Sequence, residues 1–219
     1  VITDVMMPAM DGIELCERIK NDVRFSHIPV IMLTAKTADE HKIEGLIAGA
    51  DDYIAKPFNP HILMLKVSNL MELSRKRHDT FKYQIEPEPS QITITPLDEV
   101  LIEKAIKYVE DNMTSADLSV EDLSRSLGMS RVHLYKKLTA ITGRSPIEFI
   151  RVIRLKRAAQ MLSDKRQNIA DVAYAVGFNN PKYFSKYFKE EFGVLPSVYQ
   201  NNKGDAPTSI DISAKMDDL

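Results

Sequence analysis

The stretch Val120-Glu-Asp-Leu-Ser-Arg-Ser-Leu-Gly-Met-Ser130 returns later in the chain as Ile169-Ala-Asp-Val-Ala-Tyr-Ala-Val-Gly-Phe-Asn179. Each copy continues into a second segment, Arg131-Val-His-Leu-Tyr-Lys-Lys-Leu138 in the first and Pro181-Lys-Tyr-Phe-Ser-Lys-Tyr-Phe188 in the second. The first segments align at an offset of 49 residues and the second segments at an offset of 50. A repeat this detailed indicates one structural unit built twice.

Each copy predicts a helix, a tight turn and a second helix. Ser119 and Asn168 are suited to cap the first helices, and each has an aspartate three residues later that can reach back to the cap. Gly128 and Gly177 fall where a short turn between helices needs a positive φ, which glycine adopts at least cost. The pattern is that of a helix-turn-helix unit.

The second helix of each copy has two faces. At ~100° per residue, one face collects apolar side chains and is expected to dock the helix: Leu134, Leu138 and Ile141, and in the second copy Phe184 and Phe188. The opposite face and its flanks are left for a partner: Val132, Tyr135, Lys136 and Thr139, and in the second copy Lys182, Ser185, Lys186 and Lys189.

Charge indicates what that partner is. Residues 125–166 hold eleven basic and two acidic side chains, a net of +9, while the whole chain carries only −2. A basic stripe on a helix-turn-helix unit is typical of a protein that binds the phosphate backbone of nucleic acid. The residues expected to contact DNA are Arg131, Val132, Tyr135, Lys136, Asn180, Lys182, Ser185 and Lys186.

The chemistry of these side chains leaves two roles open. A valine can meet a thymine methyl group, and a lysine can donate to guanine O6 or N7. The lysines can instead bind phosphates alone, which fixes register without reading sequence. Arginines more often contact phosphates, which is what we expect of Arg131, Arg144, Arg151 and Arg154.

These residues resemble the AraC/XylS-type DNA-binding domain over about residues 97–199. The resemblance implies an all-α domain in which a long helix, here residues 147–162, holds two recognition helices in adjacent major grooves of double-stranded DNA. Such a helix helps to place the two readers about one DNA turn, ~34 Å, apart.

Composition excludes several other classes. With 219 residues, 44% hydrophobic and 27% charged, the chain suits one or two soluble domains. Its apolar runs are far shorter than the ~18 residues of a membrane helix. Cys16 is the single cysteine, so no internal disulfide can form, which suits a reducing cytoplasm. The five histidines lack ligand spacing, so we expect no structural metal.

Residues 1–81 alternate apolar strands with helices. The expected strands are residues 1–5, 29–33 and 53–55, and the expected helices are residues 12–20, 39–48 and from Pro60 onward. Continuous apolar strands between helices predict part of a doubly wound α/β fold with a parallel sheet. Sites in such sheets lie at the carboxyl ends of the strands, where Asp4, Thr34 and Lys56 fall.

A carboxylate, a hydroxyl and an ammonium group suit phosphoryl transfer to the carboxylate. The motifs Ile2-Thr-Asp-Val-Met-Met-Pro, Met32-Leu-Thr-Ala and Tyr53-Ile-Ala-Lys-Pro-Phe resemble the receiver domain of response regulators. The separations of 30 and 52 residues from Asp4 to Thr34 and to Lys56 are usual in that family. The resemblance implies that Asp4 is the phosphoacceptor, Thr34 the switch hydroxyl, Lys56 the phosphate-pairing lysine and Tyr53 the rotating aromatic.

The family also holds Mg²⁺ between the phosphoacceptor and an acidic pair on its first strand. That strand would precede Val1, so Asp4 is expected to form only a partial Mg²⁺ site. We therefore expect weak Mg²⁺ binding and inefficient phosphorylation, and an unpaired edge on the first strand. Because the chain starts inside an expected strand and without Met, we expect a fragment of a longer protein.

We expect a partial receiver in residues 1–81, a linker in 82–96, an AraC-type domain in 97–200 and a flexible tail in 201–219. This order resembles the C-terminal part of hybrid two-component regulators. The resemblance implies an inner-membrane parent with this part in the cytoplasm, a histidine kinase as phosphoryl donor in the same polypeptide, and control of polysaccharide-utilisation genes. It also implies a homodimer surface in residues 39–73.

Two other functions compete with a phosphorylation-controlled transcription regulator. A haloacid-dehalogenase-like phosphatase also uses a nucleophilic Asp. That class needs a second Asp two positions later as general acid, and this chain has Met6 there. A DNA-free interaction module is disfavoured by the +9 stretch. We therefore expect no catalytic residues and no enzyme activity in residues 1–219.

Overall fold

The computed structural model describes residues 1–35, 48–85, 88–163 and 167–201. Its first part contains β1 (Ile2–Asp4), α1 (Gly12–Lys20), β2 (Ile31–Ala35), β3 (Asp52–Lys56) and α3 (Pro60–Tyr83). The helix expected over residues 39–48 lies almost wholly outside the described residues. The predicted α/β architecture is confirmed, because the described strands form one parallel sheet in the order β1-β2-β3.

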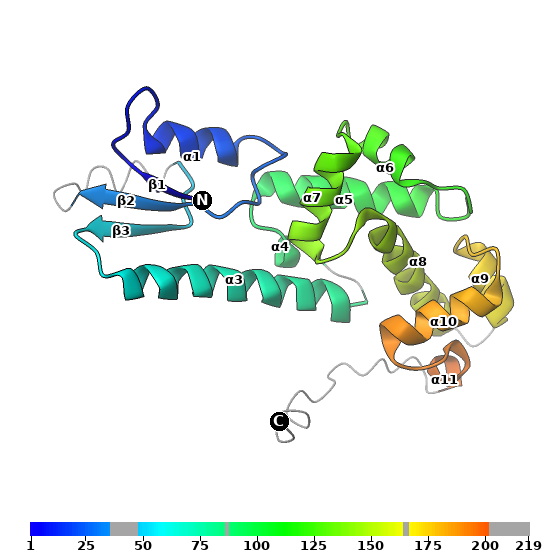
Figure 1. The fold of residues 1–219 in the computed structure, drawn as a ribbon. Helices are drawn as coiled ribbons and strands as arrows, with labels where there is room; N and C mark the ends of the chain where they lie inside the picture. The colour runs from blue at the N-terminus through cyan, green and yellow to red at the C-terminus, as the bar shows by residue number, and fades with distance from the viewer. Residues whose placement is uncertain (36–47, 86–87, 164–166, 202–219) are drawn as a thin grey trace, which may run out of the picture.

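Successive side chains of β2 point to opposite faces of the sheet, and each face is packed against a helix. Met32 joins a buried cluster with Cys16 of α1 and with Val5 and Val30. Ile31, one residue earlier, lines the opposite face with Val67 and Leu70 of α3. Figure 1 shows α1 and α3 on opposite sides of the sheet. Among the described strands β1 pairs with β2 alone, so β1 is an edge of the described sheet, as predicted.

The second part is all helical, as expected. It contains α4 (Pro89–Ile92), α5 (Pro96–Asp111), α6 (Val120–Ser126), α7 (Arg131–Thr142), α8 (Pro146–Ser163), α9 (Ile169–Ala175), α10 (Pro181–Phe192) and α11 (Pro196–Asn201). The central helix α8 contacts α5, α7, α9, α10 and α11 (Figure 1). Its buried side chains include Phe149, Ile153 and Leu162, which join most of these helices into one core.

The two parts share that core. Helix α3 leaves the sheet and continues to Tyr83, and its residue Phe81 is fully buried among the side chains of the helical domain. The expected linker also contains structure, because α4 occupies part of it and Ile92 is buried in the same core. Pro89 and Pro96 stand in the first turns of α4 and α5, where a missing N–H costs nothing.

The repeated units form as the sequence predicts, with one difference. The capping box expected at the start of both first helices is present in α6, whereas in the described helix α9 only the cap residue itself bonds to the backbone. Ser119 and Asp122 make a reciprocal capping box at the start of α6. Asn168 caps α9 by accepting a hydrogen bond from the N–H of Ala170. Gly128 and Gly177 adopt φ of +64° and +81° in the turns between the paired helices.

Among the described helices, none combines the length and apolar character needed to cross a membrane.

Candidate nucleic-acid interface and phosphoacceptor site

The apolar faces of α7 and α10 dock these helices as predicted. Leu134, Leu138 and Ile141 of α7 are buried, and so are Phe184 and Phe188 of α10. The aromatic rings of Phe184 and Phe188 lie 5.6 Å apart, and Phe188 also contacts Phe192 and Tyr199. Packing therefore fixes which side of each helix faces the solvent.

The outward face of α7 carries the side chains proposed to contact DNA. Val132 is 63% exposed and Tyr135 is 54% exposed, although both are apolar or aromatic. Arg131 and Lys136 are also exposed. An open groove of about 720 Å³ runs beside them and is bounded on its other side by the start of α8: Ser145, Pro146 and Ile147.

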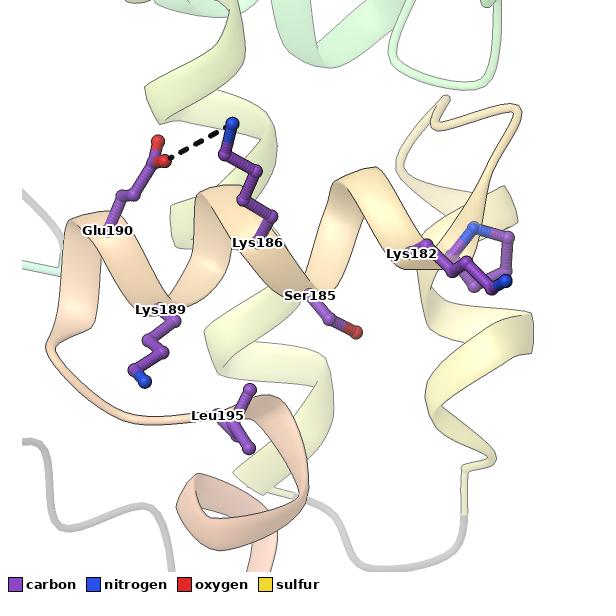
Figure 2. Close-up of a pocket in the computed structure, with 7 residues that line it drawn as sticks. Lys182, Ser185, Lys186, Lys189, Glu190 and Leu195 are labelled. Carbon is purple, nitrogen blue, oxygen red and sulfur yellow. Dashed lines mark ion pairs between the residues drawn. The ribbon is translucent and has the colours of Figure 1, made fainter.

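An equivalent groove of about 730 Å³ runs beside α10. Lys182, Ser185, Lys186 and Lys189 project from α10, and Leu195 bounds the groove before α11 (Figure 2). Lys186 also approaches Glu190 at 3.8 Å, an exposed ion pair of the kind that contributes little to stability. Asn180 caps α10 through the N–H of Lys182.

The repeat relates the two grooves. At an offset of 50 residues, Lys136 corresponds to Lys186, Tyr135 to Ser185 and Val132 to Lys182. One lysine therefore recurs at the same place in both grooves, while the neighbouring side chains differ in size and charge. Each groove can therefore bind an anionic group through its lysine, with different side chains beside it.

Three basic residues of the +9 stretch are structural, which corrects the sequence interpretation. Lys137 is fully buried, and Arg154 and Lys156 are 8% and 3% exposed. Arg154, expected at a phosphate, donates to the carbonyl oxygens of Gly177 at 3.2 Å and of Ser115 at 2.5 Å. Lys156 donates to the carbonyl oxygen of Gln84, and burial lowers its pKa to about 8.

Other basic residues of the stretch remain at the surface. Arg131 and Lys136 are exposed, as is Arg125. Arg144 is partly buried and pairs with Glu191 at 3.1 Å. The guanidinium group of Arg151 lies 4.2 Å from the ring centroid of Tyr187. The basic surface is therefore narrower than the count of charges suggested, and Lys136 lies within it.

The receiver residues meet at the carboxyl edge of the sheet. Asp4 ends β1 and Lys56 ends β3, and their side chains form an ion pair. This hydrogen bond from Lys56 is the main reason that the pKa of Asp4 lies below its usual value. Thr34 of β2 is 7% exposed and donates to the carbonyl oxygen of Ala35 at 3.2 Å.

Tyr53 lies partly buried on β3, and its side chain packs against the buried cluster that contains Cys16 and Met32. Its hydroxyl is buried and has no hydrogen-bond partner among the described residues. Burial raises the pKa of this hydroxyl to about 12. The aromatic ring is therefore held inside this part of the chain.

The described residues around Asp4 do not by themselves complete a metal centre. No group of three histidine, cysteine, aspartate or glutamate side chains suited to a metal ion occurs within the described ranges. Asp4 supplies one carboxylate, and that carboxylate already bonds to Lys56. A Mg²⁺ ion needs about six oxygen ligands in near-octahedral geometry, so these residues alone fit it poorly.

Sequence patterns missed a buried polar cluster. Ser26, Asp98 and Lys137 are fully buried and bonded to one another. The available signal was at position 137, where the first copy has a lysine and the second copy has the aromatic Tyr187.

Comparison with known families gives two matches. Residues 1–68 match the response regulator receiver domain, and residues 123–202 match a helix-turn-helix domain. The chain is 47% identical over 201 residues to histidine kinase P4 of Formosa agariphila, covering 92% of this chain and 15% of that protein. It is 34% identical to transcriptional regulatory protein SpaR of Bacillus subtilis, covering 80% of this chain and 77% of that protein.

One of the similar solved structures matches about half of this chain. It is the C-terminal domain of AraT, a response regulator from Geobacillus stearothermophilus, and the sequence identity is 29%. The match covers 47% of this chain and 84% of the AraT domain, with a TM-score of 0.43. The chain spans less than a sixth of the Formosa kinase, since it covers 15% of that protein.

Proposed function

Because this chain belongs to the response-regulator family and joins a receiver segment to an AraC-type helix-turn-helix domain, we propose that it is a phosphorylation-controlled, sequence-specific DNA-binding transcription regulator. The observation that carries the DNA-binding part is the equivalence of Lys136 and Lys186. They occupy the same position of the repeat, and each lies beside an open groove on an exposed helix face.

In the proposed complex, α7 and α10 enter two adjacent major grooves of one duplex while α8 joins them. Val132 and Tyr135 contact base edges in one groove, where a valine suits a thymine methyl group. Lys182 and Ser185 do so in the other groove, with Asn180 at the start of the same helix. Arg131 binds phosphate, and Lys136 and Lys186 donate to bases or to phosphates.

Binding to DNA can be tested with a duplex selected from a random-sequence library by the 219-residue chain. We expect Lys136→Ala and Lys186→Ala each to weaken binding, because each removes a cation from one groove. If these lysines contact phosphates, each variant also lowers the magnitude of the log–log salt slope by ~0.9. Lys104→Ala, an exposed lysine on α5, is the matched control. Unchanged binding of the two groove variants contradicts the proposal.

For the signalling part, we propose that Asp4 accepts a phosphoryl group from a histidine kinase in the same parent polypeptide. The similarity to a protein named histidine kinase P4 supports this proposal, as does the ion pair between Asp4 and Lys56. Thr34 and Tyr53 would respond to the phosphoryl group, and Mg²⁺ would be held by the complete receiver. Phosphoryl transfer from the kinase to Asp4 in the parent protein, absent in Asp4→Asn, is the test.

The remaining features of the proposal follow from the same family. The receiver part would occupy residues 1–81, the linker 82–96 and the DNA-binding domain 97–200, and the tail expected at 201–219 lies almost wholly outside the described residues. This part of an inner-membrane parent would work in the cytoplasm, pair with a second copy through residues 39–73, of which 48–73 are among the described residues, and control polysaccharide-utilisation genes. Sedimentation of the phosphorylated parent and expression profiling of its deletion strain test the last two points.

A further inference from the structure

Three fully buried polar side chains join the receiver segment to the first helix-turn-helix unit. Ser26 lies between α1 and β2, Asp98 in the first turn of α5, and Lys137 in the middle of α7. The hydroxyl of Ser26 donates to a carboxylate oxygen of Asp98 at 2.8 Å and accepts from the ammonium group of Lys137 at 2.7 Å. Lys137 and Asp98 also form an ion pair.

The carboxylate of Asp98 is occupied on both oxygens. One oxygen accepts from Ser26 and Lys137, and the other accepts from the N–H of Thr95 at 3.3 Å. The hydroxyl of Thr95 in turn accepts from the N–H of Asp98, which completes the capping box of α5. A shift of α7 would separate Lys137 from this carboxylate inside the protein, so the cluster favours one rotation of α7.

The second copy of the repeat has no lysine at this position. Tyr187 corresponds to Lys137 at the offset of 50 residues, and its ring packs under the guanidinium group of Arg151 at 4.2 Å. The apolar docking positions on either side are the same kind of residue in both copies. The lysine therefore marks the copy whose second helix, α7, packs against α3 and bonds to Ser26.

Two further contacts reach the same side of α7. The ring of Phe25 lies edge-on to His133 with centroids 6.2 Å apart, and Nε2 of His78 bonds to the carbonyl oxygen of Ala140 at 2.9 Å. Residues 133, 137 and 140 share one face of α7. The face that carries Val132, Tyr135 and Lys136 lies about 110° further around the helix axis. The receiver segment thus holds α7 while its outward face stays exposed.

We propose that Lys137 is a positioning residue for the first recognition helix, and that Ser26 is the receiver-side contact through which the receiver segment sets the orientation of α7. The inference rests on the proposed DNA-binding function. A displacement of the loop that carries Ser26 acts on α7, whereas α10 keeps its own packing. The two recognition helices therefore respond unequally to the receiver segment.

The test removes only the receiver-side hydroxyl. Ser26→Ala keeps the ion pair between Asp98 and Lys137, and Ser26→Thr restores a hydroxyl. Thr80→Ala is the matched control, because it removes a receiver-side hydroxyl that bonds only within its own helix, to the carbonyl oxygen of Lys76. Binding is measured on the library-selected duplex and on two derivatives with one half-site scrambled. Lys136→Ala and Lys186→Ala identify which half-site each recognition helix contacts.

We expect Ser26→Ala, which removes the hydrogen bonds that the Ser26 hydroxyl makes with Asp98 and with Lys137, to weaken binding to the intact duplex roughly three- to tenfold. The loss should persist when the α10 half-site is scrambled and vanish when the α7 half-site is scrambled. Ser26→Thr and Thr80→Ala should bind like the wild type. Equal losses on both scrambled duplexes, or no loss, would overturn the positioning role. Failure of the wild type to select any duplex would instead contradict the proposed function.

Hydrogen exchange without DNA gives an independent readout. Ser26→Ala should speed exchange in residues 131–142 of α7 and leave residues 181–192 of α10 unchanged. An equal rise in both helices would mean general destabilisation and would overturn the proposal, as would unchanged exchange in α7.

Discussion

The ring of Phe81 stacks on the ring of Phe149, with centroids 5.6 Å apart and an interplanar angle of 7°. Phe81 belongs to α3, which starts beneath the receiver sheet, and Phe149 belongs to α8, which joins the two helix-turn-helix units. Both side chains are fully buried. This stack and the cluster around Lys137 place the receiver segment and the DNA-binding domain on a shared core.

Truncation of that stack should destabilise the whole molecule. We expect Phe81→Ala to lower the free energy of unfolding by about 3–5 kcal/mol, because a buried aromatic ring is lost and a cavity remains. Urea denaturation followed by circular dichroism measures the change. Met71→Ala, at a position of the same helix that is 69% exposed, should change it by less than about 0.5 kcal/mol. Similar effects of the two variants would show that Phe81 does not join the parts.

The turn glycines of the two copies should differ in their tolerance of alanine. Gly128 has φ +64° and open space around a built Cβ, so Gly128→Ala should cost only the left-handed backbone strain of about 1–2 kcal/mol. Gly177 has φ +81°, and its Cβ would lie 2.3 Å from the carbonyl oxygen of Met113. Gly177→Ala must therefore also move the backbone and should cost more. Thermal unfolding of the two variants compares them, and equal melting temperatures would refute the difference.

Acidification should weaken the interface between receiver segment and α7 through His27. Burial, followed by the charge of Lys137, lowers the pKa of His27 from 6.5 to about 4. The unfolded chain therefore binds a proton at this residue near pH 6.5, while the folded chain does so only near pH 4. The contribution of neutral His27 to the free energy of unfolding is therefore present in full above pH 6.5 and is lost as the pH falls toward 4.

His27→Gln removes this titration. Its free energy of unfolding should fall less than that of the wild type between pH 6.5 and pH 5, as measured by urea denaturation at several pH values. His61→Gln, at an exposed position of α3, is the matched control and should follow the wild type. Parallel curves for wild type and His27→Gln would exclude His27 as the group responsible.

Labelling of Asp4 by acetyl phosphate should be slow in the 219-residue chain. The described residues supply one carboxylate for Mg²⁺ at this edge, and charge neutralisation by the metal is part of phosphoryl transfer. Intact-mass spectrometry should detect a small labelled fraction that is absent in Asp4→Asn and reduced in Lys56→Ala. Rapid, near-complete labelling of the wild type would contradict this expectation.

Local order in this protein could be predicted from the sequence. The repeat located α6, α7, α9 and α10, the caps and turn glycines set their ends, and the 3.6-residue period separated their docking faces from their exposed faces. The apolar runs ending in Asp4, Thr34 and Lys56 predicted the parallel sheet and its carboxyl edge. These features depend on residues close in the chain or on a short repeating pattern.

Only the tertiary structure decided which charges are available to a partner. Lys137 is one of the basic residues of the +9 stretch, but Asp98 and Ser26, 39 and 111 residues earlier in the chain, enclose it. Arg154 is likewise held by the backbone of two distant turns. Periodicity gives the direction of a side chain from its own helix. Whether that direction ends in solvent or at a carboxylate depends on which other elements pack there, and this is set by the fold as a whole.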